Sequence, residues 1–449
     1  MSFPKYPEYK DSGIDWLGEV PAHWRVCKLG FQYKVDLGKM LDAKRITGDA
    51  LVPYLRNQDV QWGRINTDSL PVMDISEGEL ERYTVRHGDI LVCEGGDVGR
   101  AALWAGSDRK VGFQKALHRL RPWTRGSQKS EYLLAVLFAA KISGYYDQDE
   151  SKATIAHLPA EKFRQLRFPF PPAQEQQIIA AFLDHETARI DALVEEQKRL
   201  IELLNEKRQA VISHAVKSFG DGPAGKLGYY IDLLPGYAFP SSGFDHDTGV
   251  RLLRGVNVSV GSTRWDDVVY WPYDEKIRGL DEYWLKEGDL VIGMDRPWIS
   301  SGARVARIKN SDLPALLLQR VARVRARNGL DQDFLELALS SQEFKDSIEA
   351  DMTGVSVPHI SPEQISSFRI ALPKVDKQSE IVQEARRELD KLTQLLEEAS
   401  INITLMQEHR SALISAAVTG KIDVRGWRAD QQPEQSEVLM AAEERASYS

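Results

Sequence analysis

Two long stretches of the chain place their apolar residues at alternating steps of three and four, the spacing of a coiled-coil helix. The first, Ala173–Lys217, has no internal Gly or Pro and follows a Pro-rich lead at 168–172, as expected because proline is tolerated before a helix and not inside it. Its seam runs through Leu183, Thr187, Ile190, Val194, Gln197, Ile201, Leu204, Arg208, Val211 and Ala215. The seam of the second stretch runs through Ala385, Leu389, Leu392, Leu396, Ala399, Ile403, Met406, Arg410, Leu413 and Ala417. We expect two matched helices packed on each other as a coiled coil.

The two stretches belong to a larger duplication. A shift of 202 positions lays Thr154–Val216 over Ser356–Val418 without a gap. Upstream the match is looser: Lys28–Phe31 corresponds to Lys226–Tyr229, and Gly88–Val92 corresponds to Gly288–Ile292. The repeated unit is far longer than the ~20–50 residues of a solenoid repeat. It has the size of a domain plus a helix, present twice.

The segments before each helix have a different pattern. Residues 28–125 and 226–327 are broken by Gly, Asp and Asn, and contain short β-type runs at 90–93, 290–292 and 321–325. Short helices are predicted at 131–142 and 333–341. The predicted fold class is α+β, with two tandem, mostly β domains separated by two long helices in an antiparallel coiled coil, related by a pseudo-two-fold internal repeat.

We divide the chain accordingly. The predicted parts are a first domain at 1–150, the first helix with its lead at 151–218, a second domain at 219–352, the second helix with its lead at 353–427, and a polar tail at 428–449 that we expect to be disordered.

Composition places the chain among ordinary soluble proteins, and charge modifies that picture only slightly. Of the net charge of −8, nearly all is carried by the two helices and the tail, so the remaining domains are close to neutral and can present a basic face to nucleic acid. No window resembles a membrane span or a signal peptide, which favours the cytoplasm. Cys27 and Cys93 are predicted to be buried free thiols in a reducing compartment.

Enzymatic signatures are scarce. The glycine-rich run Glu94–Arg100 lacks the spacing and the strand–loop–helix frame of a nucleotide site, so a tight turn is the better interpretation. No Asn-Pro-Pro-Tyr or Asp-Pro-Pro-Tyr methyltransferase signature occurs, and the nine histidines show no metal-ligand spacing. His157 and His359 recur in the repeat just before the Pro-rich leads, where a structural role is favoured over catalysis.

The duplicated domain–helix pattern resembles the specificity subunit of type I restriction–modification systems. Local strings carry the resemblance as well: Tyr6–Gly13, Trp16–Trp24, the helix start Pro171–Gln176, and the helix end Arg208–Val216, which Arg410–Val418 repeats. One departure is that Lys377-Gln378 stands where the first copy has Glu175-Gln176, so the contact made by Glu175 is expected to differ in the second copy.

The resemblance implies a non-catalytic subunit whose two target-recognition domains each read half of an interrupted site in double-stranded DNA. It implies two methyltransferase subunits and restriction subunits as partners. S-adenosylmethionine would then be bound by the methyltransferase, and ATP and Mg by the restriction subunit, with no cofactor or metal on this chain. The alternatives are a coiled-coil scaffold whose paired β domains bind protein, and the recognition half of a single-chain enzyme. The second is disfavoured because both ends look complete and no methyltransferase motif precedes them.

Sequence readout in a DNA groove requires paired donors and acceptors, which Arg, Asn and Gln supply. A loop of this composition follows an apolar strand in each copy: the first polar loop (residues 56–64) and the second polar loop (residues 254–265). The candidate DNA-binding residues are Lys39, Lys44, Arg45, Arg56, Asn57, Gln58, Gln61, Trp62 and Arg64 in the first copy, and Arg254, Asn257, Ser259, Arg264, Trp265, Arg296 and Arg304 in the second. For Arg56 and Arg254, which both copies share, an internal salt bridge is an equal alternative, because residues that read different half-sites should differ.

The seam arginines Arg208 and Arg410 predict the helix direction. In a parallel pair, the two guanidinium groups would meet in an apolar interface without a counter-ion. Antiparallel packing instead brings Arg410 near Asp184 and Glu186, and Arg208 near Glu384 and Glu388. About 45 residues at ~1.5 Å each would form a spacer of roughly 65–70 Å.

Overall fold

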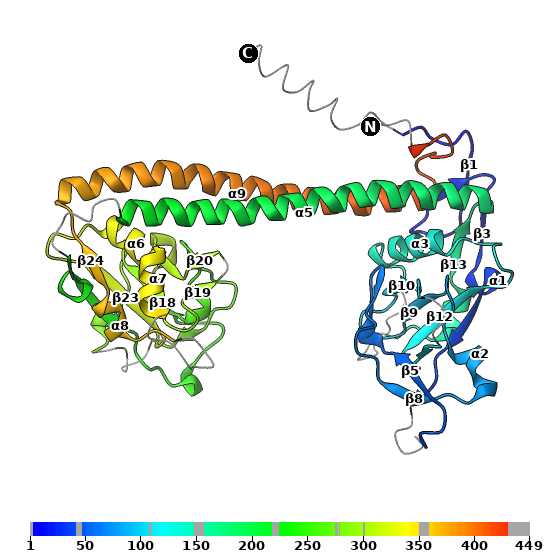
Figure 1. The fold of residues 1–449 in the computed structure, drawn as a ribbon, viewed down its shortest axis with the longest axis horizontal. Helices are drawn as coiled ribbons and strands as arrows, with labels where there is room; N and C mark the ends of the chain where they lie inside the picture. Colours follow the sequence, from blue (N-terminus) through cyan, green and yellow to red (C-terminus); the bar gives the residue numbers. More distant parts are fainter. Residues whose placement is uncertain are drawn as a thin grey trace, which may run out of the picture. The chain divides into compact units, whose positions relative to one another are not determined.

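The computed structural model describes residues 3–41, 47–106, 110–147, 157–217, 224–273, 277, 279–299, 301–349 and 359–429. The chain divides into two compact units: unit 1 comprises Met1–Val194 and Thr404–Ser449, and unit 2 comprises Glu195–Ile403. Both long helices, α5 (Ala173–Lys217) and α9 (Val375–Val418), contribute to each unit (Figure 1). None of the helices in the described ranges combines the length and apolar character that a bilayer span requires.

Unit 1 is built on a four-stranded antiparallel sheet with the order β10-β9-β12-β4, and beside it lies a three-stranded sheet with the order β11-β5-β8. Its strands are β1 (Tyr9–Asp11), β2 (Glu19–Pro21), β3 (Arg25–Lys28), β4 (Tyr33–Leu37), β5 (Leu51–Leu55), β6 (Val60–Gln61), β7 (Arg64–Ile65), β8 (Val72–Asp74), β9 (Ile90–Cys93), β10 (Ala101–Leu103), β11 (Gly112–Phe113), β12 (Leu117–Pro122) and β13 (Arg167–Phe170). Its shorter α-helices are α1 (Leu29–Gln32), α2 (Leu80–Tyr83), α3 (Ser130–Ile142) and α4 (Ala160–Gln165).

Unit 2 repeats this topology with its own strands. The order β15-β23-β18-β21 reproduces β4-β12-β9-β10, and β17-β16-β22 reproduces β8-β5-β11. The strands are β14 (Ala224–Lys226), β15 (Ile231–Pro235), β16 (Val250–Leu253), β17 (Tyr270–Trp271), β18 (Leu290–Gly293), β19 (Trp298–Ile299), β20 (Gly302–Ala303), β21 (Val305–Arg307), β22 (Ala315–Leu317), β23 (Val321–Ala326) and β24 (Arg369–Ala371). The shorter helices are α6 (Gln332–Ser340), α7 (Gln342–Glu349) and α8 (Pro362–Ser367). The predicted β runs and both short helices are confirmed.

Residues that recur in the repeat support the sheets. The fully buried β9 and β18 are each preceded by an Asp, and both of these carboxylates are almost fully buried. Asp89 accepts two hydrogen bonds from Arg121, at 2.7 and 2.6 Å, and Asp289 is held in the same way by Arg325. The repeated Gly-Asp motif is therefore part of the fold, because a buried carboxylate requires such partners. Cys93 is a buried free thiol, as predicted, whereas Cys27 is free but only half-buried.

The long helices run antiparallel, as predicted, and this follows from the contacts inside each unit. In unit 1, the first half of α5 packs with the last part of α9, and Arg410 bonds Asp191 at 2.9 and 3.2 Å. In unit 2, Ile212 near the end of α5 shares one apolar cluster with Ile381 and Ala385 near the start of α9.

The predicted partners of the seam arginines are wrong. Arg410 pairs with Asp191, about one to two turns beyond Asp184 and Glu186. Arg208 has no bond to Glu384 or Glu388 within the described residues; the carboxylate that acts on it most is Glu336 of α6. A seam of evenly spaced apolar residues fixes the facing side of each helix. It leaves the register to be set where the helix ends dock on the domains.

Glu175 is the centre of a clasp between the two terminal regions of unit 1. Its carboxylate is buried and accepts hydrogen bonds from Tyr6 Oη at 2.7 Å and Trp24 Nε1 at 2.9 Å, and it lies 2.7 Å from His23 Nε2. We call residues 3–24 and 419–427 the terminal clasp; the Asp423 amide donates to the Pro4 carbonyl across it. The equivalent Lys377 is exposed and pairs with Glu380. The two copies therefore differ at this position, as expected.

Candidate nucleic-acid interface

The polar loops occupy equivalent places in the two units. Each begins with an arginine that caps a single 3₁₀ turn, η2 (Asn57–Asp59) after β5 and η6 (Gly255–Asn257) after β16. Each turn leads into a tight hairpin that is tied to the edge of the main sheet. The Gly63 amide donates to the Ala101 carbonyl, and the Gly261 amide donates to the Val305 carbonyl. The fold thus presents two loops of different sequence on one scaffold.

Arg56 and Arg254 are engaged inside the fold. Arg56 donates two hydrogen bonds to Asp59, at 2.9 and 2.8 Å, and these bonds raise the pKa of Arg56. Arg254 pairs with Asp267 at 2.7 Å, and its Nε is buried without a partner. This geometry is the internal salt bridge that the sequence left as an equal alternative to base contact.

Four other candidates hold the loops in shape. Asn57 donates to the Gly95 carbonyl at 3.0 Å, and the buried Asn257 donates to the Arg264 and Asp267 carbonyls at 2.9 Å. Trp62 packs edge-on against Phe138 of α3, with ring centroids 5.2 Å apart. Trp265 donates from Nε1 to Asp312 at 2.9 Å. Groups that use their donors internally have little left to offer a ligand.

A smaller set of candidates remains available to solvent. Its exposed members are Gln58, Gln61, Arg64, Arg264 and Arg296, and Ser259 is half-buried. Gln61 Nε2 donates to the Gln58 carbonyl at 2.9 Å, and Arg64 faces Gln61 across the hairpin. The exposed amides and guanidinium of the first polar loop therefore form one continuous polar surface.

Arg296 stands out because of its backbone. It has a φ of +45°, and the equivalent position in unit 1 is Gly96 with a φ of +72°. A non-glycine residue in this region is strained, and such strain is characteristic of functional sites. The neighbouring Asp295 fixes the loop by accepting from His359 at 2.8 Å and from Arg320 at 2.9 Å. Desolvation raises the pKa of Asp295, but these hydrogen bonds outweigh it and lower the pKa overall.

Of the remaining predicted cations, two have partners inside the fold and two lie outside the described residues. Arg304 donates to the carbonyls of Val258 and Asp295, at 2.9 and 2.8 Å, and so links the second polar loop to the Arg296 loop. Lys39 pairs with Glu79 at 2.7 Å, and this contact lowers the pKa of Glu79 to about 2. Lys44 and Arg45 lie outside the described residues.

Sequence reasoning missed a third loop in each unit. In unit 1, Asn57 also approaches the Ala116 carbonyl, next to the exposed Lys115. In unit 2, Gly255 lies against Arg304 and the Arg320 carbonyl, beside the exposed Gln319. The signal was available, because both segments directly precede equivalent strands, β12 and β23. The structure thus gathers three loops at the same edge of each unit.

This arrangement is suited to recognition. Exposed amides and guanidiniums can read base edges, and neighbouring cations can contact phosphates. Glu94–Arg100 forms the tight connection between β9 and β10, as predicted, with the Arg100 amide donating to the Asp97 carbonyl. Within the ranges that the structure describes, no group of three or more His, Cys, Asp or Glu side chains could hold a metal ion.

Comparisons with known proteins agree with this picture. The model of the type I restriction modification DNA specificity domain matches residues 21–203. The type I restriction enzyme MjaVIII specificity subunit of Methanocaldococcus jannaschii is 25% identical over 451 residues, covering 95% of this chain and 98% of its own. The EcoAI specificity subunit of Escherichia coli is 41% identical over 158 residues, 35% of this chain and 26% of its own. A chain from a structural study of complex assembly and conformational transition in the type I R-M system superposes with a TM-score of 0.64 at 15% identity, covering 89% of this chain and 98% of its own. That likeness shows a shared fold.

Proposed function

We propose that the chain is a specificity subunit of a type I restriction–modification system, a subunit that recognises DNA sequence and carries no catalytic site of its own, and that each of its two units reads one part of an interrupted, two-part site. The observation that carries the proposal is the contrast between framework and loops. The Asp–Arg pairs under the sheets recur in both units, whereas the exposed side chains of the polar loops differ.

The readers in this proposal are the exposed residues. Gln58, Gln61 and Arg64 read the first half-site, and Ser259, Arg264 and Arg296 read the second. Arg56, Arg254, Asn57, Asn257, Trp62, Trp265 and Arg304 shape the loops that carry them. Lys39, Lys44 and Arg45 add positive charge beside the first loop. Base readout by Arg and Gln and orientation by neighbouring cations are the usual division of labour at DNA.

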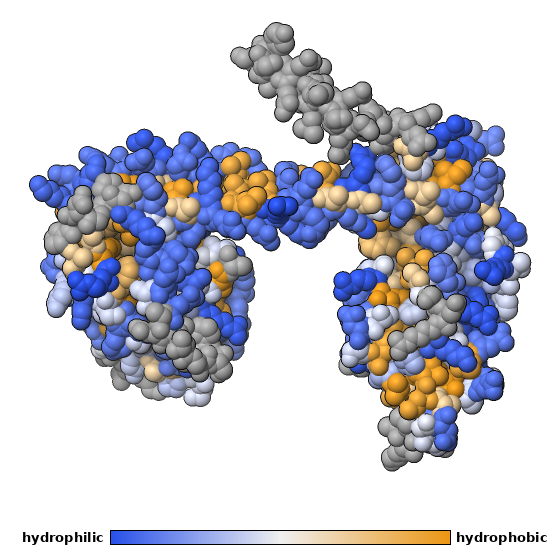
Figure 2. All heavy atoms as spheres, in the orientation of Figure 1, coloured by the Kyte–Doolittle hydropathy of each residue, from blue (hydrophilic) through white to orange (hydrophobic). Residues whose placement is uncertain are grey.

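The helices serve in this proposal as spacer and docking platform. The predicted division at 1–150, 151–218, 219–352 and 353–427 assigns one helix to each reader. Apolar residues outside the coiled-coil seam are exposed: in unit 2, Leu200, Leu203 and Ile401 are 41%, 53% and 58% exposed. Figure 2 shows apolar side chains at the surface of the helices. An apolar strip of this kind favours a protein partner.

We assign that strip to two methyltransferase subunits, with restriction subunits joining the core complex on host DNA in the cytoplasm. S-adenosylmethionine belongs to the methyltransferase subunits, and ATP and Mg belong to the restriction subunits. The isolated chain should therefore bind no S-adenosylmethionine and transfer no methyl group. With its methyltransferase it should confer methylation on a two-part site.

Methylome sequencing of a host that expresses the chain with its methyltransferase tests the proposal. Exchanging residues 226–350 for those of a related subunit should change one half-site only. Arg64→Ala or Gln58→Ala should relax the first half-site, at about 1–3 kcal/mol per lost bidentate contact. Arg296→Gly should relax only the second half-site without destabilising the loop, because unit 1 has Gly96 at that position.

The control variants distinguish residues that contact bases from residues that support the loop. Arg56→Gln should weaken binding to all sequences alike, because it disrupts the loop itself. Uniform weakening by Arg64→Ala and Arg296→Gly would show that these residues touch phosphate. Methylation by the isolated chain would contradict the proposed role as a whole.

A further inference from the structure

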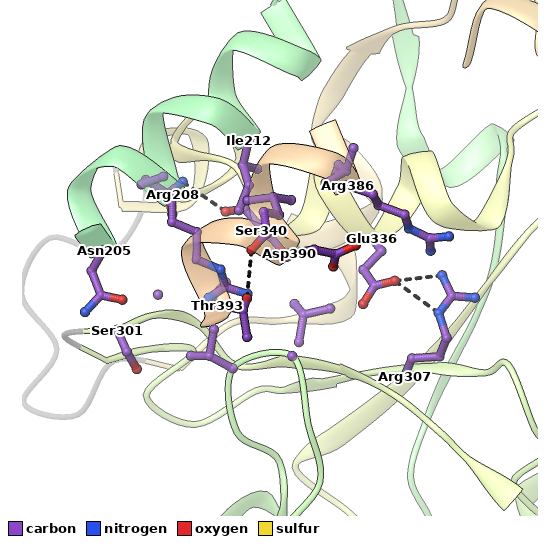
Figure 3. Close-up of a pocket in the computed structure, with 18 of the residues that line it drawn as sticks. Asn205, Arg208, Ile212, Ser301, Arg307, Glu336, Ser340, Arg386, Asp390 and Thr393 are labelled. Carbon is purple, nitrogen blue, oxygen red and sulfur yellow. Dashed lines mark hydrogen bonds and ion pairs between the residues drawn. The ribbon is translucent and has the colours of Figure 1, made fainter. Parts of the chain in front are cut away.

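A cavity of about 300 Å³ in unit 2 lies where the two long helices meet the second domain. Arg208 and Ile212 of α5 line one side, and Leu389 and Thr393 of α9 line another; α6 and the hairpin turn at Val260–Gly261 close it. Figure 3 shows Arg208 and Thr393 among the side chains that line this space. It is large enough for a small ligand or an inserted side chain.

Arg208 is a half-buried cation that lines this cavity without an anionic partner within the described residues. Its Nε is buried and makes no hydrogen bond, and within the described residues no ion pair is formed by its guanidinium. Two of the three carboxylates that line the cavity are already occupied: Arg307 bonds Glu336 at 2.7 Å, and both Arg307 and Arg386 bond Asp333. The third, Asp390 of α9, makes no ion pair with Arg208 within the described residues. Burial lowers the pKa of Arg208, with Glu336 opposing the shift. A half-buried guanidinium without an anion carries a desolvation cost unless an anion binds to it.

The internal repeat shows which partner binds the equivalent arginine, Arg410, in unit 1. In unit 1, Arg410 holds the carboxylate of Asp191 at 2.9 and 3.2 Å. The shift of 202 positions that relates the helices places Thr393 where the first copy has Asp191. Thr393 uses its hydroxyl on the Leu389 carbonyl, at 2.8 Å. Unit 2 has therefore kept the arginine and has no acid at the position of Asp191, although Asp390 lines the cavity one turn earlier in α9.

The same comparison explains why there is space. In unit 1, Trp62 of the hairpin packs against Phe138 of α3. The equivalent residues in unit 2 are Val260 and Ser340, and both line the cavity. Two large rings have been replaced by two small side chains in front of Arg208, so the lost acid and the opened volume coincide.

We propose that this cavity is a carboxylate-binding site, in which an external carboxylate bonds Arg208 as Asp191 bonds Arg410. Two parallel N–H donors of a guanidinium match the two oxygens of a carboxylate. The carboxylate can come from a free small acid or from an acidic side chain of a partner subunit. The Val260–Gly261 turn belongs to the second polar loop, so occupancy would also brace the loop that carries Ser259 and Arg264.

The first experiment uses the isolated full chain and needs neither DNA nor a partner, so its outcome is independent of the proposed function. The probe is succinate, with sodium chloride at the same ionic strength as the reference. Succinate should raise the thermal midpoint by about 2–4 °C, the shift expected for a site filled to several times its dissociation constant. It should also move the ¹⁵Nε–Hε resonance of Arg208, which is assigned by its absence from Arg208→Gln.

The matched variant is Thr393→Asp, which restores the acid of the first copy. It should raise the thermal midpoint by itself and abolish the response to succinate. Arg208→Gln should abolish the response while leaving the cavity, and it provides the same test should Thr393→Asp fold poorly. An equal response to inorganic phosphate would overturn the assignment to carboxylates.

The second experiment identifies a partner as the source. If succinate has no effect, the acid belongs to a methyltransferase subunit. Thr393→Asp and Arg208→Gln should then each weaken its binding by tenfold or more without changing DNA binding. Partner binding unchanged in both variants, together with no response to succinate, would overturn the proposal. So would an Arg208→Gln variant that weakens binding to all DNA sequences and reduces the salt dependence, because Arg208 would then bind a phosphate.

Discussion

Replacing Glu175 should open the terminal clasp of unit 1. Tyr6 is 3% exposed and Trp24 is fully buried, and both donate to this carboxylate. Glu175→Ala leaves two buried donors without an acceptor, at about 1–3 kcal/mol each. His23 has a side chain that is 41% exposed and can turn to water, so it adds little. The expected loss is therefore about 2–6 kcal/mol.

The substitutions should form a graded series. Glu175→Gln keeps one oxygen that can accept from both Tyr6 and Trp24, so it should cost only about 1 kcal/mol. Lys377→Ala changes the equivalent position of the second copy, where an exposed side chain pairs with Glu380. It should stay within about 0.5 kcal/mol.

Hydrogen exchange is the appropriate assay because it reads the clasp separately from the rest of the chain. The amide of Asp423, bonded to Pro4, and the amide of Ala22, bonded to Glu8, report on the two segments. In Glu175→Ala, their exchange should accelerate at least about thirtyfold, since 1.4 kcal/mol corresponds to a factor of ten. Equal protection in the Ala and Gln variants would refute the account of Glu175 as the shared acceptor.

Two further predictions concern helix register and acid stability. In a chain with Cys27 and Cys93 replaced by Ser, Asp191→Cys and Arg410→Cys should be joined by a short bismaleimide, because these residues form an ion pair. Arg208→Cys with Arg410→Cys should not be joined, and the reverse result would contradict the antiparallel register. Burial lowers the pKa of His118 to about 4; its Nε2 lies 2.7 Å from the Leu158 carbonyl, and its Nδ1 has no partner. The ring is neutral in the folded state, so stability is full above pH ~6.5 and falls by about 2 kcal/mol on going from pH 7 to pH 5. Denaturant titrations at the two pH values should show this loss in the parent and a smaller one in His118→Gln; equal losses would exclude His118 as the cause.

The sequence predicted the helices well because their signals are local and long. The Pro-rich lead and the absence of Gly and Pro place the start of α5 at Ala173 and its end at Lys217. Arg208 and Arg410 on the seam predicted the antiparallel direction, because a charge in an apolar interface excludes the parallel arrangement. The register could not be predicted in this way. It depends on where each helix end docks, and Arg410 meets Asp191 for that reason.

The candidate site was harder to predict because many candidate side chains bond groups that are distant in sequence. Arg56 bonds Asp59 three residues away, which a local reading could have found. Lys39 bonds Glu79, and Arg304 bonds the Val258 and Asp295 carbonyls, which only the folded loops bring together. The strain at Arg296 is likewise invisible in the sequence, except that its counterpart is Gly96. The residue type thus indicates which side chains could contact DNA, and only the tertiary contacts show which of them are not already bonded within the fold.

The internal repeat can be used as a comparison of the protein with itself. Positions that stay the same and are engaged, such as Asp89 and Asp289, support the fold. Positions that differ and are exposed, such as Arg64 in one unit and Arg296 in the other, are where two different half-sites would be read. Arg208 fits neither group, because the residue is kept while its acid partner is lost. If Arg208 only supported the fold, the second copy should have an acid where the first has Asp191. If Arg208 read a base, its residue type should differ from that of Arg410 in the first copy. The proposed external acid accounts for an arginine that both copies share and that lies beside an open cavity in unit 2.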